Sequence, residues 1–117
     1  MAKQDHLGEF EQLALLAVMR LGGEAYGASI QKELDGTAGR SAAISSIYIT
    51  LTRLESKGMV SSSMGEPTDD RGGRPRRYFR VERAGVEALR EARERLLSMW
   101  SGLESELEGG YRGAHGG

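Results

Sequence analysis

The stretch that most constrains the fold is residues 44–60, ISSIYITLTRLESKGMV, because its apolar residues repeat with the period of an α-helix. Five of them fall at i, i+3, i+4, i+7 and i+10 on one helix face: Ile44, Ile47, Tyr48, Leu51 and Leu54. The opposite face carries short polar side chains and a single positive charge: Ser45, Ser46, Thr50, Thr52, Arg53 and Ser56. Lys57 places a cation in the last turn, and Gly58 tolerates a positive φ. We therefore expect this helix to end at about residue 57.

The segments that follow predict a β-hairpin with a basic loop. Residues 59–64 and 76–81 have the composition of short strands, and residues 65–75 (GEPTDDRGGRP) form a turn-rich connection between them. The apolar alternation of the second strand predicts that at least two of Tyr78, Phe79 and Val81 pack under the preceding helix. A helix, a hairpin and then a further helix is the order of a winged helix-turn-helix. The predicted fold class is therefore mainly α with a small β-hairpin (α+β).

The hairpin loop also predicts a surface for the phosphate backbone or the minor groove of DNA. Four arginines supply the positive charge on its return side: Arg71, Arg74, Arg76 and Arg77. The alternative is a flexible loop of mixed charge.

Short motifs run through the chain in one order: Leu13-Ala14-Leu15-Leu16, Tyr26-Gly27 with Ile30, Tyr48, Leu51, Arg53-Leu54-Glu55, Lys57-Gly58, Val60, Gly65-Glu66-Pro67, Arg71-Gly72-Gly73, Arg76-Arg77-Tyr78 and Gly85. Over residues 7–103 this series resembles the PadR family of bacterial transcriptional regulators. The resemblance implies a DNA-binding regulator that dimerises through its last helix. The chain departs from the usual family pattern with Ser45-Ser46 in place of Gly-Thr, Ile49 in place of Pro, and Glu82 in place of Thr. Because residues 45, 46 and 49 are expected to point outward, we expect their changes to alter the operator and leave the fold intact.

The helix over residues 44–57 spans about 21 Å, which suits the major groove of B-DNA. The side chains expected to contact DNA from it are Ser45, Ser46, Ile49, Thr50 and Arg53. The serines can donate to phosphates or base edges, a methyl group of Ile49 or Thr50 can contact a thymine methyl, and Arg53 can bind a guanine or a phosphate. A solvated helix face is the alternative. We expect Glu55 to pair with a nearby arginine, since phosphates repel an acid.

The upstream segments predict two supporting helices, over residues 8–21 and from Tyr26 to about residue 34. Tyr26 either donates its hydroxyl to a phosphate or is a half-buried aromatic. Arg40 lies in the connector over residues 37–43, which could include a very short strand, and we expect it to contact the phosphate backbone. Leu15 and Met19 are candidates for contact with a partner subunit or a ligand, and core packing is the alternative.

The last helix, expected over residues 83–108, carries a 3-4-3-4 apolar seam that is longer than so small a domain can cover. The residues predicted at a dimer interface are Leu89, Ala92, Leu96, Met99, Trp100 and Leu103. A symmetric dimer would place two recognition helices about one DNA turn apart on an inverted repeat. By resemblance, Trp100 could stack on a flat effector between the subunits, with Leu15 and Met19 nearby. The alternative is an interface aromatic without a ligand.

Composition excludes several classes of function. The net charge is −1, but residues 37–83 hold nine Lys and Arg against five Asp and Glu (+4), and the rest hold seven against twelve (−5). The chain has no cysteine, and both histidines, His6 and His115, lie near its ends, so we expect neither catalysis nor a metal or cofactor. We expect disordered ends over residues 1–6 and 109–117, a DNA-binding domain over residues 7–82, and a cytoplasmic protein, because no apolar run could span a membrane.

The sequence and the resemblance together predict a homodimeric repressor that binds an inverted repeat in duplex DNA, and a small hydrophobic or aromatic effector could release it. The alternative is a winged-helix module that binds proteins without specific DNA binding. The salt dependence of DNA affinity separates the two.

Overall fold

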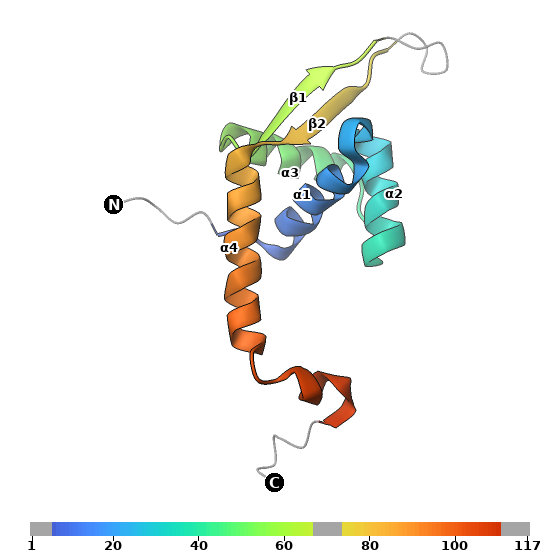
Figure 1. Ribbon diagram of the computed structural model, residues 1–117. Helices are drawn as coiled ribbons and strands as arrows, with labels where there is room; N and C mark the ends of the chain where they lie inside the picture. The colour runs from blue at the N-terminus through green and yellow to red at the C-terminus, as the bar shows by residue number, and fades with distance from the viewer. Residues whose placement is uncertain (1–5, 67–73, 111–117) are drawn as a thin grey trace.

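The computed structural model describes residues 6–66 and 74–110, and it has the predicted fold class (Figure 1). Its elements are α1 (Glu9–Leu21), the 3-10 turn η1 (Gly22–Glu24), α2 (Gly27–Ala38), α3 (Ile44–Ser56), β1 (Val60–Met64), β2 (Arg77–Val81), α4 (Arg83–Trp100) and the short turn η3 (Glu106–Gly110). The order of helices and hairpin is that of a winged helix-turn-helix. Arg71 and most of the ends expected to be disordered lie outside the described residues.

The core lies where α3 packs against α1, α2 and the hairpin. Ile47, Leu51 and Leu54 of α3 are fully buried, as their spacing predicted. Their neighbours in this core include Leu15, Val18, Ile30, Leu34 and Phe79. Full burial of a side chain of this size contributes about 1.5–3 kcal/mol, so the inward stripe of α3 is the main reason that the helix has one fixed orientation.

The second helix is longer than expected. It runs through Asp35 and Gly36 to Ala38, and its C-cap residue, Gly39, has a left-handed φ of 63°. The N–H groups of Gly39 and Arg40 donate to the carbonyls of Asp35 and Leu34, which closes the end of α2. A glycine inside a helix costs about 0.5–1 kcal/mol relative to alanine, which is too little to end a helix that packs on both α1 and α3. The short strand considered for residues 37–43 does not form.

The hairpin lies across the domain with one face toward α3 (Figure 1). Val60 pairs with Val81 and Met64 pairs with Arg77 in the antiparallel register. Alternation then places Phe79 and Val81 on the face that packs on the core, which confirms the prediction for these two residues. On the other edge of β2, the N–H of Phe79 donates to the carbonyl of Ala25 at 2.8 Å. The hairpin is therefore attached to both α3 and the segment before α2.

The last helix extends away from the rest of the domain (Figure 1). It ends at Trp100, and Gly102 follows with φ of 87°. The expectation of one continuous helix to residue 108 is therefore wrong, because a residue with positive φ cannot continue a right-handed helix. Within the described ranges, no helix is long and apolar enough to cross a membrane.

Candidate nucleic-acid interface

The outward face of α3 presents small polar side chains beside the hairpin. Ser45, Ser46, Ile49, Thr52 and Arg53 are all exposed. Ile49 is the large apolar member of this set, with 60% of its surface exposed. Small side chains around it allow close approach of the helix to a groove floor.

Thr50 does not belong to this surface, and the expectation that it points outward is wrong. Only 6% of its surface is exposed. The physical reason is its spacing, because Ile47, Thr50, Leu51 and Leu54 fall at i, i+3, i+4 and i+7 and therefore share the inward face. Thr52 was absent from the predicted contacts, although Ser45, Ile49 and Thr52 fall at i, i+4 and i+7 and share the outward face. That spacing was the signal that could have identified it.

One flank of α3 lies beside the first turn of α1, where two arginines meet two acids. Arg53 Nη1 is 3.6 Å from Glu11 Oε2, and Arg40 Nη1 is 3.9 Å from Glu9 Oε1. Arg40 also lies over the ring of Phe10, at 4.8 Å from its centroid. The two arginine side chains remain 52% and 42% exposed. Surface ion pairs of this kind contribute about 0–1 kcal/mol, so a phosphate can compete for both guanidinium groups.

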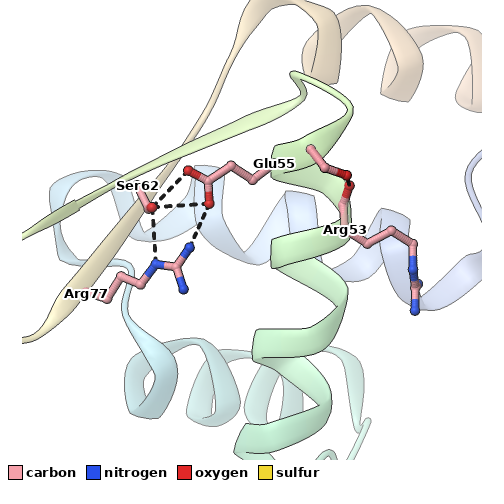
Figure 2. A network of polar contacts seen from close by, with 5 residues as sticks. Arg53, Glu55, Ser62 and Arg77 are labelled. Carbon is pink, nitrogen blue, oxygen red and sulfur yellow. Dashed lines mark hydrogen bonds and ion pairs between the residues drawn. The ribbon is translucent and has the colours of Figure 1, made fainter.

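The other flank of α3 contacts the hairpin through a polar network (Figure 2). Arg77 Nη2 donates to Glu55 Oε1 at 2.7 Å, which confirms that Glu55 pairs with an arginine. The Ser62 hydroxyl donates to the same carboxylate at 3.0 Å and accepts from Arg77 Nε at 3.1 Å. Arg77 was predicted as a DNA contact, but its guanidinium is engaged on the protein side of the hairpin. Arg53 points away from this network.

The loop end of the hairpin contacts the start of α2 through a stack of side chains. The guanidinium of Arg76 lies over the ring of Tyr26, at 4.2 Å from its centroid. Tyr78 meets the same ring in a T-shaped contact with centroids 5.6 Å apart. Of the two alternatives considered for Tyr26, the structure therefore matches the half-buried aromatic. Arg74 is exposed in the segment before β2.

A second surface lies between α1 and α4 and includes no residue of α3. It is a groove of about 530 Å³ lined by Leu16, Met19, Leu96, Leu97 and Trp100 among others. Leu15 is fully buried on the core side of α1, so its predicted role as a ligand or partner contact is wrong, and Leu16 is the residue that faces outward. Leu15 lies one turn from Val18, and both side chains are buried where α1 packs on the core.

The predicted interface seam divides into a covered part and an exposed part. Ala92 is only 5% exposed in the single chain, and Leu89 packs against the core. The assignment of Ala92 to a partner contact is therefore wrong, because it already faces its own domain. Further along α4, an apolar surface remains exposed at Leu96, Met99 and Trp100 and continues to Leu103. No group of three His, Cys, Asp or Glu that could hold a metal occurs in the part of the chain that the structure describes.

Comparisons with known proteins agree with this geometry. The model of the transcriptional regulator PadR-like family matches residues 15–91. A PadR family transcriptional regulator from Eggerthella lenta is 29% identical, with 86% of this chain and 88% of that chain covered and a TM-score of 0.62.

Two further structures support the fold at lower identity. A PadR-like transcriptional regulator from Bacillus cereus is 22% identical, with 87% and 93% coverage of this chain and that chain and a TM-score of 0.64. A transcriptional regulator from Clostridium thermocellum is 21% identical, with 81% and 89% coverage and a TM-score of 0.64. No curated protein matches the chain. The extent of the family match, together with the winged helix-turn-helix, shows that the chain belongs to the PadR-like family of transcriptional regulators.

Proposed function

We propose that this regulator is a homodimeric repressor that binds an inverted repeat in duplex DNA and blocks access to a promoter. The observation that carries the proposal is the outward face of α3, where short polar side chains surround Ile49 and Arg53 beside a basic hairpin. An α-helix of this length fits the major groove, and side chains on its outer face can read base edges. The hairpin supplies affinity through the backbone.

The start of α3 supports a phosphate contact. Its N-cap residue is Ala43, which has no side-chain acceptor for the first-turn N–H groups. Those groups, with the exposed hydroxyls of Ser45 and Ser46, can donate to a phosphate oxygen. Arg40 and Arg53 add positive charge on the flank beside α1.

The proposed dimer uses the exposed apolar part of α4. Beyond Ala92, the stripe that faces the core continues through Leu96, Met99 and Trp100, which remain exposed among the described residues. Contiguous apolar surface of this kind is typical of an interface between subunits. A two-fold axis there would relate two copies of α3, each of which binds one half-site, with the half-sites about 34–36 Å apart.

The proposal includes a small apolar or aromatic effector that binds in the groove between α1 and α4. Trp100 is the single tryptophan of the chain, so quenching of its fluorescence on titration reports binding there directly. The same titration should release bound DNA if the effector favours a dimer geometry that α3 cannot use. A compound that quenches Trp100 and leaves DNA affinity unchanged would show a ligand site without regulation.

Selection of bound duplexes from random DNA tests the central proposal. The selected duplex should bind more tightly than a scrambled one at the same salt concentration, and its affinity should fall steeply with salt. Arg53→Ala should cost about 1–3 kcal/mol with relaxed specificity at one base pair, if Arg53 reads a base. Arg74→Ala should weaken all sequences alike and reduce the salt slope. Equal affinity for both duplexes with little salt dependence would instead favour a protein-binding module.

A further inference from the structure

Glu55 lies where a DNA-binding surface would ordinarily exclude an acid. It is on α3, two residues from Arg53, and its side chain is 32% exposed. A carboxylate close to DNA phosphates is repelled and lowers affinity unless it has another role. Its contacts indicate that role, because they join the reading helix to the hairpin.

The network around Glu55 links three elements. Glu55 is on α3, Ser62 is on β1, and Arg77 is on β2 (Figure 2). Because Met64 pairs with Arg77 in the register, Ser62 lies diagonally across from Arg77 on the same face of the hairpin. Each pair within the triangle is connected: Arg77 to Glu55 at 2.7 Å, Ser62 to Glu55 at 3.0 Å, and Arg77 to Ser62 at 3.1 Å.

The guanidinium of Arg77 is further restrained by its own strand. It lies over the ring of Phe79, 5.0 Å from the centroid, and Phe79 is buried against Tyr48 of α3. An arginine that makes two charge-assisted bonds and stacks on a buried ring has little freedom to turn toward a phosphate. Its contacts therefore serve the attachment of the hairpin to α3.

We propose that Glu55 is a positioning residue for the hairpin, and that Arg77 is its anchor and does not bind phosphate. Together with Ser62 they fix the angle between the hairpin and α3, so that the hairpin cations reach the backbone when α3 occupies the major groove. The contacts of Tyr26 and Ala25 hold the other side of β2 to α2, and Glu55 supplies the restraint from the reading helix. This inference rests on the proposed function.

The variant Glu55→Gln separates this role from a simple electrostatic one, because the two predict opposite signs. If Glu55 only repels DNA and competes for Arg77, its neutralisation should tighten binding of the selected duplex. If Glu55 positions the hairpin, its neutralisation should weaken binding roughly tenfold, since the loss of a charged hydrogen bond loosens the attachment. Ser62→Ala, which removes the central hydroxyl with the least change in shape, should weaken binding in the same direction.

The salt dependence tests the role of Arg77. Arg77→Ala should lower affinity while the slope of log K against log salt stays the same, because no phosphate contact and no counterion is lost. Arg74→Ala, in the segment just before β2, is the matched control. It should reduce the magnitude of the slope by about 0.9 for each protomer.

Two further comparisons distinguish positioning from general damage to the fold. The exchanged pair Glu55→Arg with Arg77→Glu should recover most of the affinity that each single change loses, because the ion pair is restored in reverse. In the Glu55→Gln background, Arg74→Ala should cost less than in the wild type, since a displaced hairpin no longer brings Arg74 to the backbone. Thermal unfolding followed by circular dichroism identifies any variant that does not fold, and Ser62→Ala then carries the test.

The proposal is overturned if Glu55→Gln and Ser62→Ala bind as tightly as the wild type or more tightly, or if Arg77→Ala reduces the salt slope as Arg74→Ala does. Those results would leave DNA binding itself intact. If the wild type binds selected and scrambled duplexes equally and without salt dependence, the proposed function fails and the positioning role fails with it.

Discussion

Thr50 and Thr52 are chemically identical and two positions apart on α3, yet Thr50 is in the core and Thr52 is on the surface. The angular position on the helix decides the difference, and the residue type carries no information about it. Ile49, between them, points away from the domain. Of the two side chains first considered for a thymine methyl, Ile49 is therefore the one that can reach it.

We predict that Ile49 contacts a thymine methyl in each half-site. Ile49→Ala should weaken binding of the selected duplex by about 1 kcal/mol per half-site, because apolar contact is lost. Replacement of the contacted thymidine by deoxyuridine removes only the methyl group and should cost a similar amount. The two losses should not add, which a binding titration of all four combinations would measure.

The fold should be insensitive to this change, since Ile49 is exposed and alanine is a better helix former. Deoxyuridine at thymidines outside the half-sites is the control and should leave affinity unchanged. If the two losses add fully, Ile49 and the methyl group do not touch.

We predict that Gly85→Ala destabilises the protein by about 1–3 kcal/mol, because the added methyl group overfills a close contact. A Cβ at Gly85 would lie 2.5 Å from the carbonyl oxygen of Met59 and 2.8 Å from Val81 Cγ1. Gly36→Ala in α2 is the control, since a Cβ there meets no atom within 4 Å. It should stabilise the protein by about 0.4–1 kcal/mol. Urea unfolding measures both, and equal midpoints for the two variants would contradict the argument.

At the scale of elements, the sequence predicted the hairpin and the inward face of α3, because their patterns are local. Ile47, Leu51 and Leu54 repeat with the helical period, and Phe79 and Val81 alternate along a strand. The lengths of α2 and α4 were harder to predict, because tertiary packing decides whether a helix continues past Gly36 or stops before Gly102.

Contacts between side chains of different elements could not be predicted from the sequence for a similar reason. Glu55 was expected to find an arginine, but Arg77 lies 22 residues away and its position depends on the hairpin register. Leu15 and Leu16 are neighbours of the same type, and only the packing of α1 shows that Leu15 is inside. Apolar residues occupy most faces of α1, so its sequence pattern does not show which of Leu15 and Leu16 points inward.

The contact between α1 and α2 predicts a pH dependence of stability. Glu33 of α2 accepts from the Thr37 hydroxyl at 2.6 Å and from Arg20 Nε of α1 at 2.8 Å. The hydrogen bond from Thr37 and then the bond from Arg20 lower the pKa of Glu33 below its usual value. Because the folded pKa lies below the unfolded one, this contribution is complete at pH values above the unfolded pKa and is lost as pH falls through the folded pKa.

We predict that Thr37→Val, which removes the hydroxyl and keeps the shape, raises the pKa of Glu33 toward its usual value. NMR titration of the Glu33 carboxyl carbon measures this shift. The variant should be less stable than the wild type at neutral pH, and the difference should vanish below the folded pKa. Thr52→Val on α3 is the control and should leave the titration of Glu33 unchanged. A Thr37→Val deficit that persists in acid would show that the loss does not arise from ionisation of Glu33.

At the scale of the whole molecule, α4 has two successive roles along one stripe. Its first part covers the domain through Gly85 and Ala92, which are buried. Its second part presents Leu96 and Met99 on the same side of the helix, where both side chains remain exposed in the single chain. Contiguous exposed apolar surface of this kind is typical of a subunit interface. The surface that covers them is, in the proposed dimer, the same surface of a second copy.

We predict that Leu96→Glu converts the dimer to a monomer, because a carboxylate in the apolar interface would lose its hydration without a partner charge. Light scattering measures the mass, and Ser98→Glu is the matched control, since residue 98 is exposed on another side of α4. The monomer should bind a single half-site but lose about 10²-fold or more in affinity for the full inverted repeat, because the second α3 no longer binds within the same complex. Ser98→Glu should retain both the dimer mass and the affinity. If Leu96→Glu keeps the dimer mass, the two copies do not meet along this stripe, and the spacing of half-sites would have to follow from a different two-fold axis.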